Sequence, residues 1–149
     1  MKKITAVLCS MTMLLGAGVY VKANDNTDGL RHSMVQKQGK EIKVSGKGNT
    51  RTIKCTGTET VSVEGMDNKV TIVGKCAKLE VEGKSNTVKA EKVVKISVEG
   101  AENMINADQV ETISIEGMKN HVHYKKSSSK SGDADVTTEG IDNMVMKMK

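Results

Sequence analysis

The stretch VSVEGMDNKVTI, from Val61 to Ile72, decides the fold. Apolar and polar residues alternate on each side of its Gly-x-x-Asn motif at 65–68. Period-two alternation indicates short strands with one buried face, and glycine and asparagine are typical turn residues. The phrase returns as ISVEGAENMINA at 96–107 and as ISIEGMKNHVHY at 113–124. The chain therefore repeats one strand–turn–strand unit.

The Gly-x-x-Asn motif occurs six times, with steps of 19, 18, 17, 17 and 23 residues between the glycines. Glycine reaches positive φ without steric cost, and asparagine tolerates the left-handed region better than most residues. Both residues are therefore expected to shape the turns. The predicted turn residues are Gly46 and Asn49, Gly65 and Asn68, Gly83 and Asn86, Gly100 and Asn103, Gly117 and Asn120, and Gly140 and Asn143.

This near-constant period predicts an all-β fold, a β-helix-like solenoid of about six coils with one such turn in each. Stacked coils would bury a continuous column of valine and isoleucine, and the sequence has no Phe, Trp or Pro. Equivalent asparagines would lie about 4.8 Å apart, where their amides can form a ladder. A row of β-hairpins folded into a sandwich is the alternative, although hairpin meanders rarely keep so constant a period.

The N-terminal segment has the pattern of an export signal. A basic start and an apolar run fill residues 2–21, and the small residue Ala23 follows. This predicts a secretory signal peptide at 1–23, with a transmembrane anchor as the alternative. We expect a secreted or periplasmic protein with no transmembrane segment after cleavage. A flexible lead or N-terminal cap would cover 24–40, and a single solenoid domain would cover 41–149.

Charge and cysteine content are interpreted for the exported chain. The 23 Lys and Arg minus three lysines in the signal, against 18 Asp and Glu, leave a net charge of only +2. This balance gives no argument for a nucleic-acid partner. Cys9 is expected to leave with the signal, so Cys55 and Cys76 remain. In an oxidising compartment such a pair predicts a disulfide between adjacent coils, with two buried free thiols as the alternative.

The segment from Cys55 to Cys76 reads C-x-G-x-x-x-V-x-V-x-G-x-x-N-x-V-x-I-x-G-x-C. This pattern resembles the secreted bacterial family catalogued as domain of unknown function 3060, and the likeness covers roughly Ile42 to Lys147. The resemblance implies an exported bacterial protein with a repetitive β domain, and it implies no activity. Typical members are richer in Asn and Thr around the turns, where this chain has more Met, Lys and Glu.

The sequence favours a binding function over catalysis. Its three histidines are His32, His121 and His123, and no Ser or Cys nucleophile is placed beside a base by a recognisable spacing. Tyr124 is the only aromatic residue after the signal, which is a poor platform for sugars. We therefore expect no enzyme and no cofactor, but an exported structural or interaction module. Its partner would be a cell-envelope protein or polymer, or another copy of the chain.

A glutamate precedes five of the six turn glycines, and on stacked coils these side chains would align. Neighbouring carboxylates at strand spacing repel by roughly 1 kcal/mol in water. A bridging cation such as calcium would offset this, but calcium sites need ligands that converge from a loop. We therefore expect lysines to compensate. The glutamates are Glu64, Glu82, Glu99, Glu116 and Glu139, and the candidate lysines are Lys69, Lys78, Lys89 and Lys95.

A second group of side chains lies near the C-terminal end of the repeats. His121 and His123 flank Val122, and Met144 and Met146 occupy the same positions one repeat later. These four side chains are predicted to share one outer patch. Thioether and imidazole groups suit Cu(I) and Ag(I), so a periplasmic soft-metal-binding protein is the alternative function. Exposed methionines also serve as adaptable contact surfaces for other proteins.

Overall fold

A computed structural model of the chain describes residues 39–149. The predicted signal peptide at 1–23, residues 24–38 of the predicted lead, and His32 lie outside the described residues. Nine strands account for most of the described chain, and it contains no helix that is long and apolar enough to cross a membrane. The strands are β1 (Glu41–Lys47), β2 (Thr50–Thr56), β3 (Thr60–Met66), β4 (Lys69–Lys84), β5 (Thr87–Ala101), β6 (Met104–Met118), β7 (His121–Ser127), β8 (Asp135–Ile141) and β9 (Met144–Lys147).

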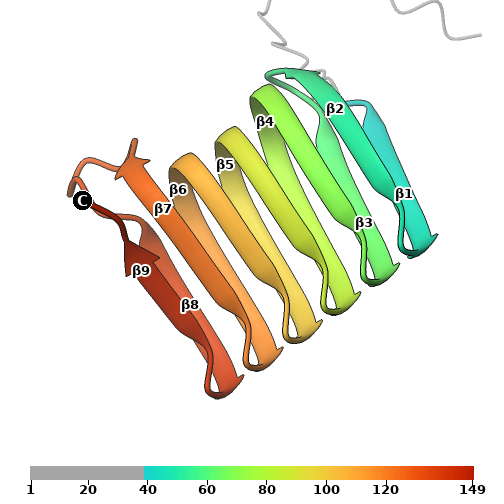
Figure 1. The fold of residues 1–149 in the computed structure, drawn as a ribbon. Coiled ribbons are helices and arrows are strands. Elements are labelled where there is room, and N and C mark those ends of the chain that lie inside the picture. Colours follow the sequence, from blue (N-terminus) through green and yellow to red (C-terminus); the bar gives the residue numbers. More distant parts are fainter. Residues whose placement is uncertain (1–38) are drawn as a thin grey trace, which may run out of the picture. The chain divides into compact units, whose positions relative to one another are not determined.

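Every strand pairs in parallel with the equivalent strand one coil away. This pairing excludes the hairpin sandwich, whose neighbouring strands run antiparallel. Each coil has a first arm before its Gly-x-x-Asn turn and a second arm after it. The long strands β4, β5 and β6 contain the second arm of one coil, a wide corner and the first arm of the next (Figure 1). The β-solenoid is confirmed, and its turns number about five, close to the predicted six.

The core is a set of aliphatic columns between the two arms. Val61 and Val63 of a first arm and Val70 and Ile72 of a second arm are at most 2% exposed, and their equivalents in the next coils repeat this burial. Burying such a side chain contributes roughly 1.5–3 kcal/mol, so the stacked columns supply the main stabilising term. Tyr124 is the one aromatic side chain in this core.

The turns bring consecutive backbones into very close approach. Gly100 has a φ of +114°, and a Cβ atom built there would lie 2.0 Å from the carbonyl oxygen of Gly83. The predicted left-handed role of asparagine is wrong. Glu102, which precedes Asn103, has the left-handed φ of +58°, and no asparagine within residues 39–149 has a positive φ.

The asparagines form the hydrogen-bonded ladder that the repeat spacing predicts, and this ladder is buried. Asn103 is 1% exposed, and its Oδ1 accepts from the backbone N and the Nδ2 of Asn86 at 3.0 and 3.1 Å. Its own Nδ2 donates to Oδ1 of Asn120 and to the carbonyl oxygen of Gly83, both at 3.0 Å. One amide therefore joins three coils with all of its polar atoms paired, which explains why a polar side chain is tolerated inside the core.

Cys55 and Cys76 form a disulfide, with their Cα atoms 5.2 Å apart. Cys55 lies at the end of β2, and Cys76 lies in the wide corner within β4, one coil later. Both side chains are buried. The disulfide joins two adjacent coils at the N-terminal end of the described solenoid, as the spacing of 21 residues predicts.

Candidate functional site

Outward side chains of the second arms form straight rows, because successive strands pair in register. Met104 pairs with His121, and His121 pairs with Met144, so these three residues form one row, called here the Met-His-Met column. The next row along the same face contains His123 paired with Met146. The structure therefore brings the four predicted soft ligands onto one face.

Met104 belongs to this site although the sequence prediction omitted it. It directly follows the turn asparagine Asn103, as His121 follows Asn120 and Met144 follows Asn143. That shared position in the repeat is the signal that identifies it. In the second row the position equivalent to His123 is Asn106, so only the first row has three soft ligands in succession.

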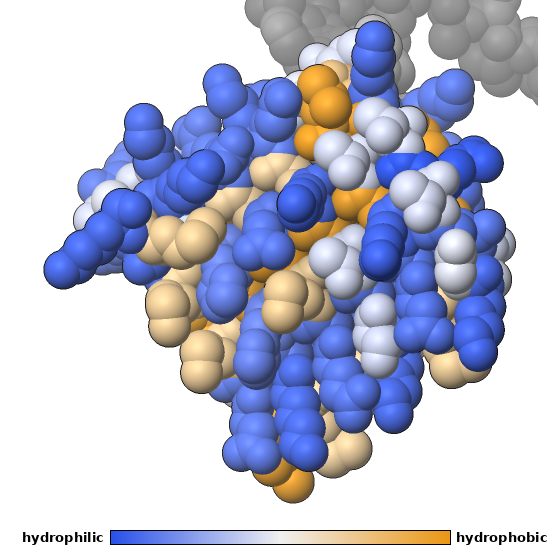
Figure 2. Space-filling view, viewed as in Figure 1, coloured by the Kyte–Doolittle hydropathy of each residue, from blue (hydrophilic) through white to orange (hydrophobic). Residues whose placement is uncertain are grey.

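The site lies within a larger apolar surface. Seven large hydrophobic residues are exposed in the described chain, and six of them follow Asn103. Figure 2 shows pale orange side chains gathered over the C-terminal strands of an otherwise mainly blue face. Five of the six lie at the tight turns or in the second arms, and we call these the methionine patch: Met104, Met118, Ile141, Met144 and Met146, each 43–61% exposed.

The predicted glutamate column is present on the opposite face, that of the first arms. Glu82, Glu99 and Glu116 are stacked in register, and Glu64 and Glu139 continue the column at its two ends. The Lys43 Nζ lies 2.6 Å from Glu64 Oε1 and lowers the pKa of that carboxyl. Among the described residues, no other member of the column makes an ion pair.

The four lysines predicted to compensate this column make no ion pair with it. Lys78 pairs with Glu80, which lies outside the column. Lys69 and Lys89 are outward residues of second arms, on the other face of the solenoid. Lys95 forms no ion pair within the described chain. The expectation was wrong for these four lysines, because Lys69 and Lys89 lie on the other face, and Lys78 and Lys95 lie in first arms but make no ion pair with the column.

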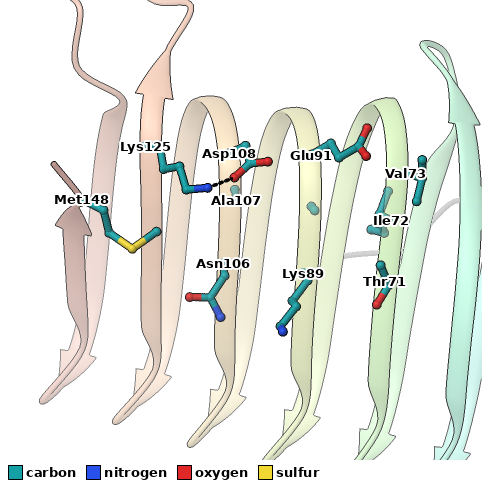
Figure 3. A pocket seen from close by; sticks show the side chains of 11 residues that line it. Thr71, Ile72, Val73, Lys89, Glu91, Asn106, Ala107, Asp108, Lys125 and Met148 are labelled. Carbon is teal, nitrogen blue, oxygen red and sulfur yellow. Dashed lines mark ion pairs between the residues drawn. The ribbon is translucent and has the colours of Figure 1, made fainter.

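A shallow cavity of about 290 Å³ opens on the second arms beside their wide corner (Figure 3). Lys89, Asn106 and Met148 are among its lining residues, and the charged groups of Lys125, Asp108 and Glu91 are already engaged. The Lys125 Nζ lies 2.7 Å from Asp108 Oδ1, and Glu91 Oε2 accepts from the backbone N of Gly74 at 2.8 Å. These contacts tie neighbouring coils together at the edge of the cavity.

Among the described residues, Glu59 is the carboxyl with a large pKa shift, and its role is structural. Glu59 accepts hydrogen bonds from the hydroxyl and the backbone N of Thr56 and from the backbone N of Gly57 and Thr58. The Thr56 hydroxyl has the largest effect, and these donors together lower the pKa of Glu59 from 4.5 to about 2. The charged carboxylate thus closes the loop between β2 and β3.

Within residues 39–149, no three His, Cys, Asp or Glu side chains are grouped so that they could hold a metal ion. These four residue types do not include methionine, whose sulfurs belong to the Met-His-Met column.

Two overlapping segments, residues 63–107 and 94–135, match the family described as "Protein of unknown function (DUF3060)". The resemblance predicted from the cysteines and turn motifs is thereby confirmed. No match was found among curated proteins, and none among solved structures.

Proposed function

Because the family that residues 63–135 match is described as one of unknown function, we propose a function from the geometry of the solenoid itself. The chain is an exported, non-catalytic interaction module, and the methionine patch is its contact surface. The observation that carries this proposal is the gathering of exposed large hydrophobic residues on the last coils. Apolar patches on a soluble surface mark sites of association, and flexible thioether side chains adapt to the shape of a partner.

Rigidity of the scaffold supports the same proposal. The backbone N atoms of Met104, His121 and Met144 each donate at 2.8 Å to a carbonyl oxygen of the neighbouring coil. The patch is therefore held by strands that lose little freedom on binding, and only side chains must be ordered. Such preorganisation lowers the entropic cost of association.

The proposal also includes export of the protein and the class of its partner. The disulfide between Cys55 and Cys76 supports an oxidising compartment, where the partner would be a cell-envelope protein or polymer, or a second copy. Stacking of copies on the last coil is disfavoured by Lys147, which occupies a core-row position beside Tyr124. Its Nζ donates to Asp133 Oδ1 at 2.8 Å, and this bond raises the pKa of Lys147.

Site-specific photo-crosslinking in the producing cell tests the contact surface. A crosslinking residue at Met146 should give one adduct of defined mass, and the same residue at Ser114 on the opposite face should not. Met144→Glu should remove the adduct, because it places a charge in the apolar contact. Equal adducts from both positions, or none from Met146, would count against the proposal.

A second candidate function is binding of Cu(I) or Ag(I), and one observation favours it. The register places His121 directly between Met104 and Met144. Soft thioethers and imidazole are ligands that suit these ions, and an exported protein can meet them. Titration with Ag(I), followed by the methionine methyl signals in NMR, tests this candidate, since saturable shifts on this face would support it and unchanged spectra would reject it.

A further inference from the structure

We propose that the Met-His-Met column is a single three-coordinate site for a soft monovalent cation, with Met104, His121 and Met144 as its ligands. This inference rests on the second candidate function and makes it more specific. It adds Met104 as a ligand, makes His121 the central one, and gives the neighbouring His123–Met146 pair a weaker role.

Strand geometry makes this ligand set possible. Neighbouring strands lie about 4.8 Å apart, so Met104 and Met144 are separated by roughly 10 Å with His121 midway. A methionine side chain has three rotatable bonds, and both sulfurs can lean toward the central imidazole from opposite sides. The imidazole nitrogen and the two sulfurs then surround one ion. The three backbones are fixed by their inter-strand hydrogen bonds, so the spacing is set before any ion arrives.

The ligand types determine which ion is favoured. Two thioethers and one imidazole are neutral, soft or intermediate donors, which favour Cu(I) and Ag(I) over Ca²⁺ and Mg²⁺. The adjoining row contributes Asn106, His123 and Met146, none of which is a carboxylate. A hard divalent cation would find no compensating charge in either row. The site therefore selects a singly charged soft ion.

The two rows differ at one position, and this difference supplies an internal comparison. His123 has a methionine on one side and Asn106 on the other, so its row offers one thioether and one imidazole. His121 has methionines on both sides. We therefore expect the first Ag(I) equivalent to occupy the column of His121, and the second row to respond only at higher concentration.

The test compares two single methionine variants in purified protein that carries Cys9→Ser, so that the cysteine outside the disulfide does not bind silver. Met104→Leu keeps an apolar side chain of similar volume and removes the sulfur. Met118→Leu is the matched control, because Met118 is similarly exposed, at 52% against 43%, but lies in the turn and outside the column. Circular dichroism without silver should show equal folding of both variants.

Ag(I) affinity should fall by about tenfold or more in Met104→Leu, since even changes outside the ligand shell of metal sites produce losses of that size. It should be unchanged in Met118→Leu. Shifts of the methyl signals of Met104 and Met144 should saturate together at one equivalent in the parent protein.

The possible outcomes separate this inference from the function on which it rests. If no variant-sensitive silver binding occurs at all, the second candidate function fails. If silver binds but Met104→Leu leaves the affinity intact, metal binding stands and the three-ligand site is overturned. Equal shifts of Met66, Met118 and the column residues would mean unspecific binding to exposed thioethers, which also overturns the site.

Discussion

Gly100→Ala tests whether the stacked turns control the stability of the solenoid. The added Cβ atom would lie 2.0 Å from the carbonyl oxygen of Gly83 and 2.9 Å from its carbonyl carbon. Both are backbone atoms of a paired strand, so no side chain can rotate away to make room. The two coils would have to separate locally, which weakens the parallel pairing of β4 with β5.

Gly46→Ala is the matched control at the equivalent position of the first coil. Gly46 has nearly the same φ, +112° against +114°, so alanine suffers the same backbone strain at both positions. The first coil has no described coil before it, and the nearest atom to a Cβ at Gly46 is Nδ2 of Asn49 at 3.3 Å. The difference between the two variants therefore isolates the contact between coils.

The expected size follows from two contributions. Placing alanine in this region of φ costs about 1–3 kcal/mol at either position. Overpacking against fixed backbone adds about 1–3 kcal/mol or more at Gly100 alone. We expect the free energy of unfolding to fall by at least about 2 kcal/mol more for Gly100→Ala than for Gly46→Ala, a large share of the stability of a domain.

Urea denaturation followed by far-UV circular dichroism measures this difference, with the slope m checking that both variants unfold the same structure. A reduced m for Gly46→Ala would mean that the first coil frays separately, as nearest-neighbour coupling in repeat proteins allows. Losses equal within about 0.5 kcal/mol, at equal m, would refute the argument that close approach between coils requires glycine.

Three further predictions use the same denaturation assay. Asn103→Ala should cost about 3–5 kcal/mol because it unpairs several buried polar groups, whereas Glu99→Ala should stay within about 0.5 kcal/mol, and equal effects would contradict the ladder. Changing both Cys55 and Cys76 to serine should cost about 3 kcal/mol through the freed loop, and a thiol reagent should find neither of these cysteines free in the unreduced, unfolded protein. Glu59→Gln should destabilise at pH 7. The folded pKa of Glu59 is lowered, so its contribution is present above the unfolded value near 4.5 and is lost as pH falls toward about 2. The variant and the parent should therefore converge in acid, and a gap that does not change with pH would contradict the role of the carboxylate.

The sequence was sufficient for the fold because the constraints on the core repeat in every coil. Alternating valines such as Val61 and Val63, followed by a turn glycine, can bury their apolar face only against another coil, and the structure shows this stacking. The ladder to which Asn68 belongs was predicted from the repeat spacing, but the backbone conformation of the turn was not predictable from residue preference. Asparagine tolerates left-handed backbone, but here the side-chain amide of Asn68 forms hydrogen bonds in the ladder. The preceding residue, Asp67, has the positive φ of 58° instead.

Contacts between outward side chains were harder to predict. Lys43 compensates Glu64, although 21 positions separate them in the sequence, because β1 lies directly beside β3. A lysine closer in sequence, Lys69, lies beyond the turn on the other face. The register of the coils, rather than distance along the chain, determines which charges meet. For the same reason Met104 becomes visible as a site residue only when the repeats are aligned on their asparagines.

The position of the proposed functional surface follows from which residue positions are not restricted by the stacking of coils. Inward rows and turn glycines are restricted to the same few residue types in every coil, and they carry little information about function. Outward rows have no such restriction. The row that begins with Thr50, Lys69 and Thr87 continues with Met104, His121 and Met144, so its chemistry changes from hard and polar to soft at the fourth coil. The glutamate column, by contrast, extends through five coils without such a change. A binding function confined to one part of a uniform scaffold requires a local departure from the repeat, and the Met-His-Met column is such a departure on the second-arm face.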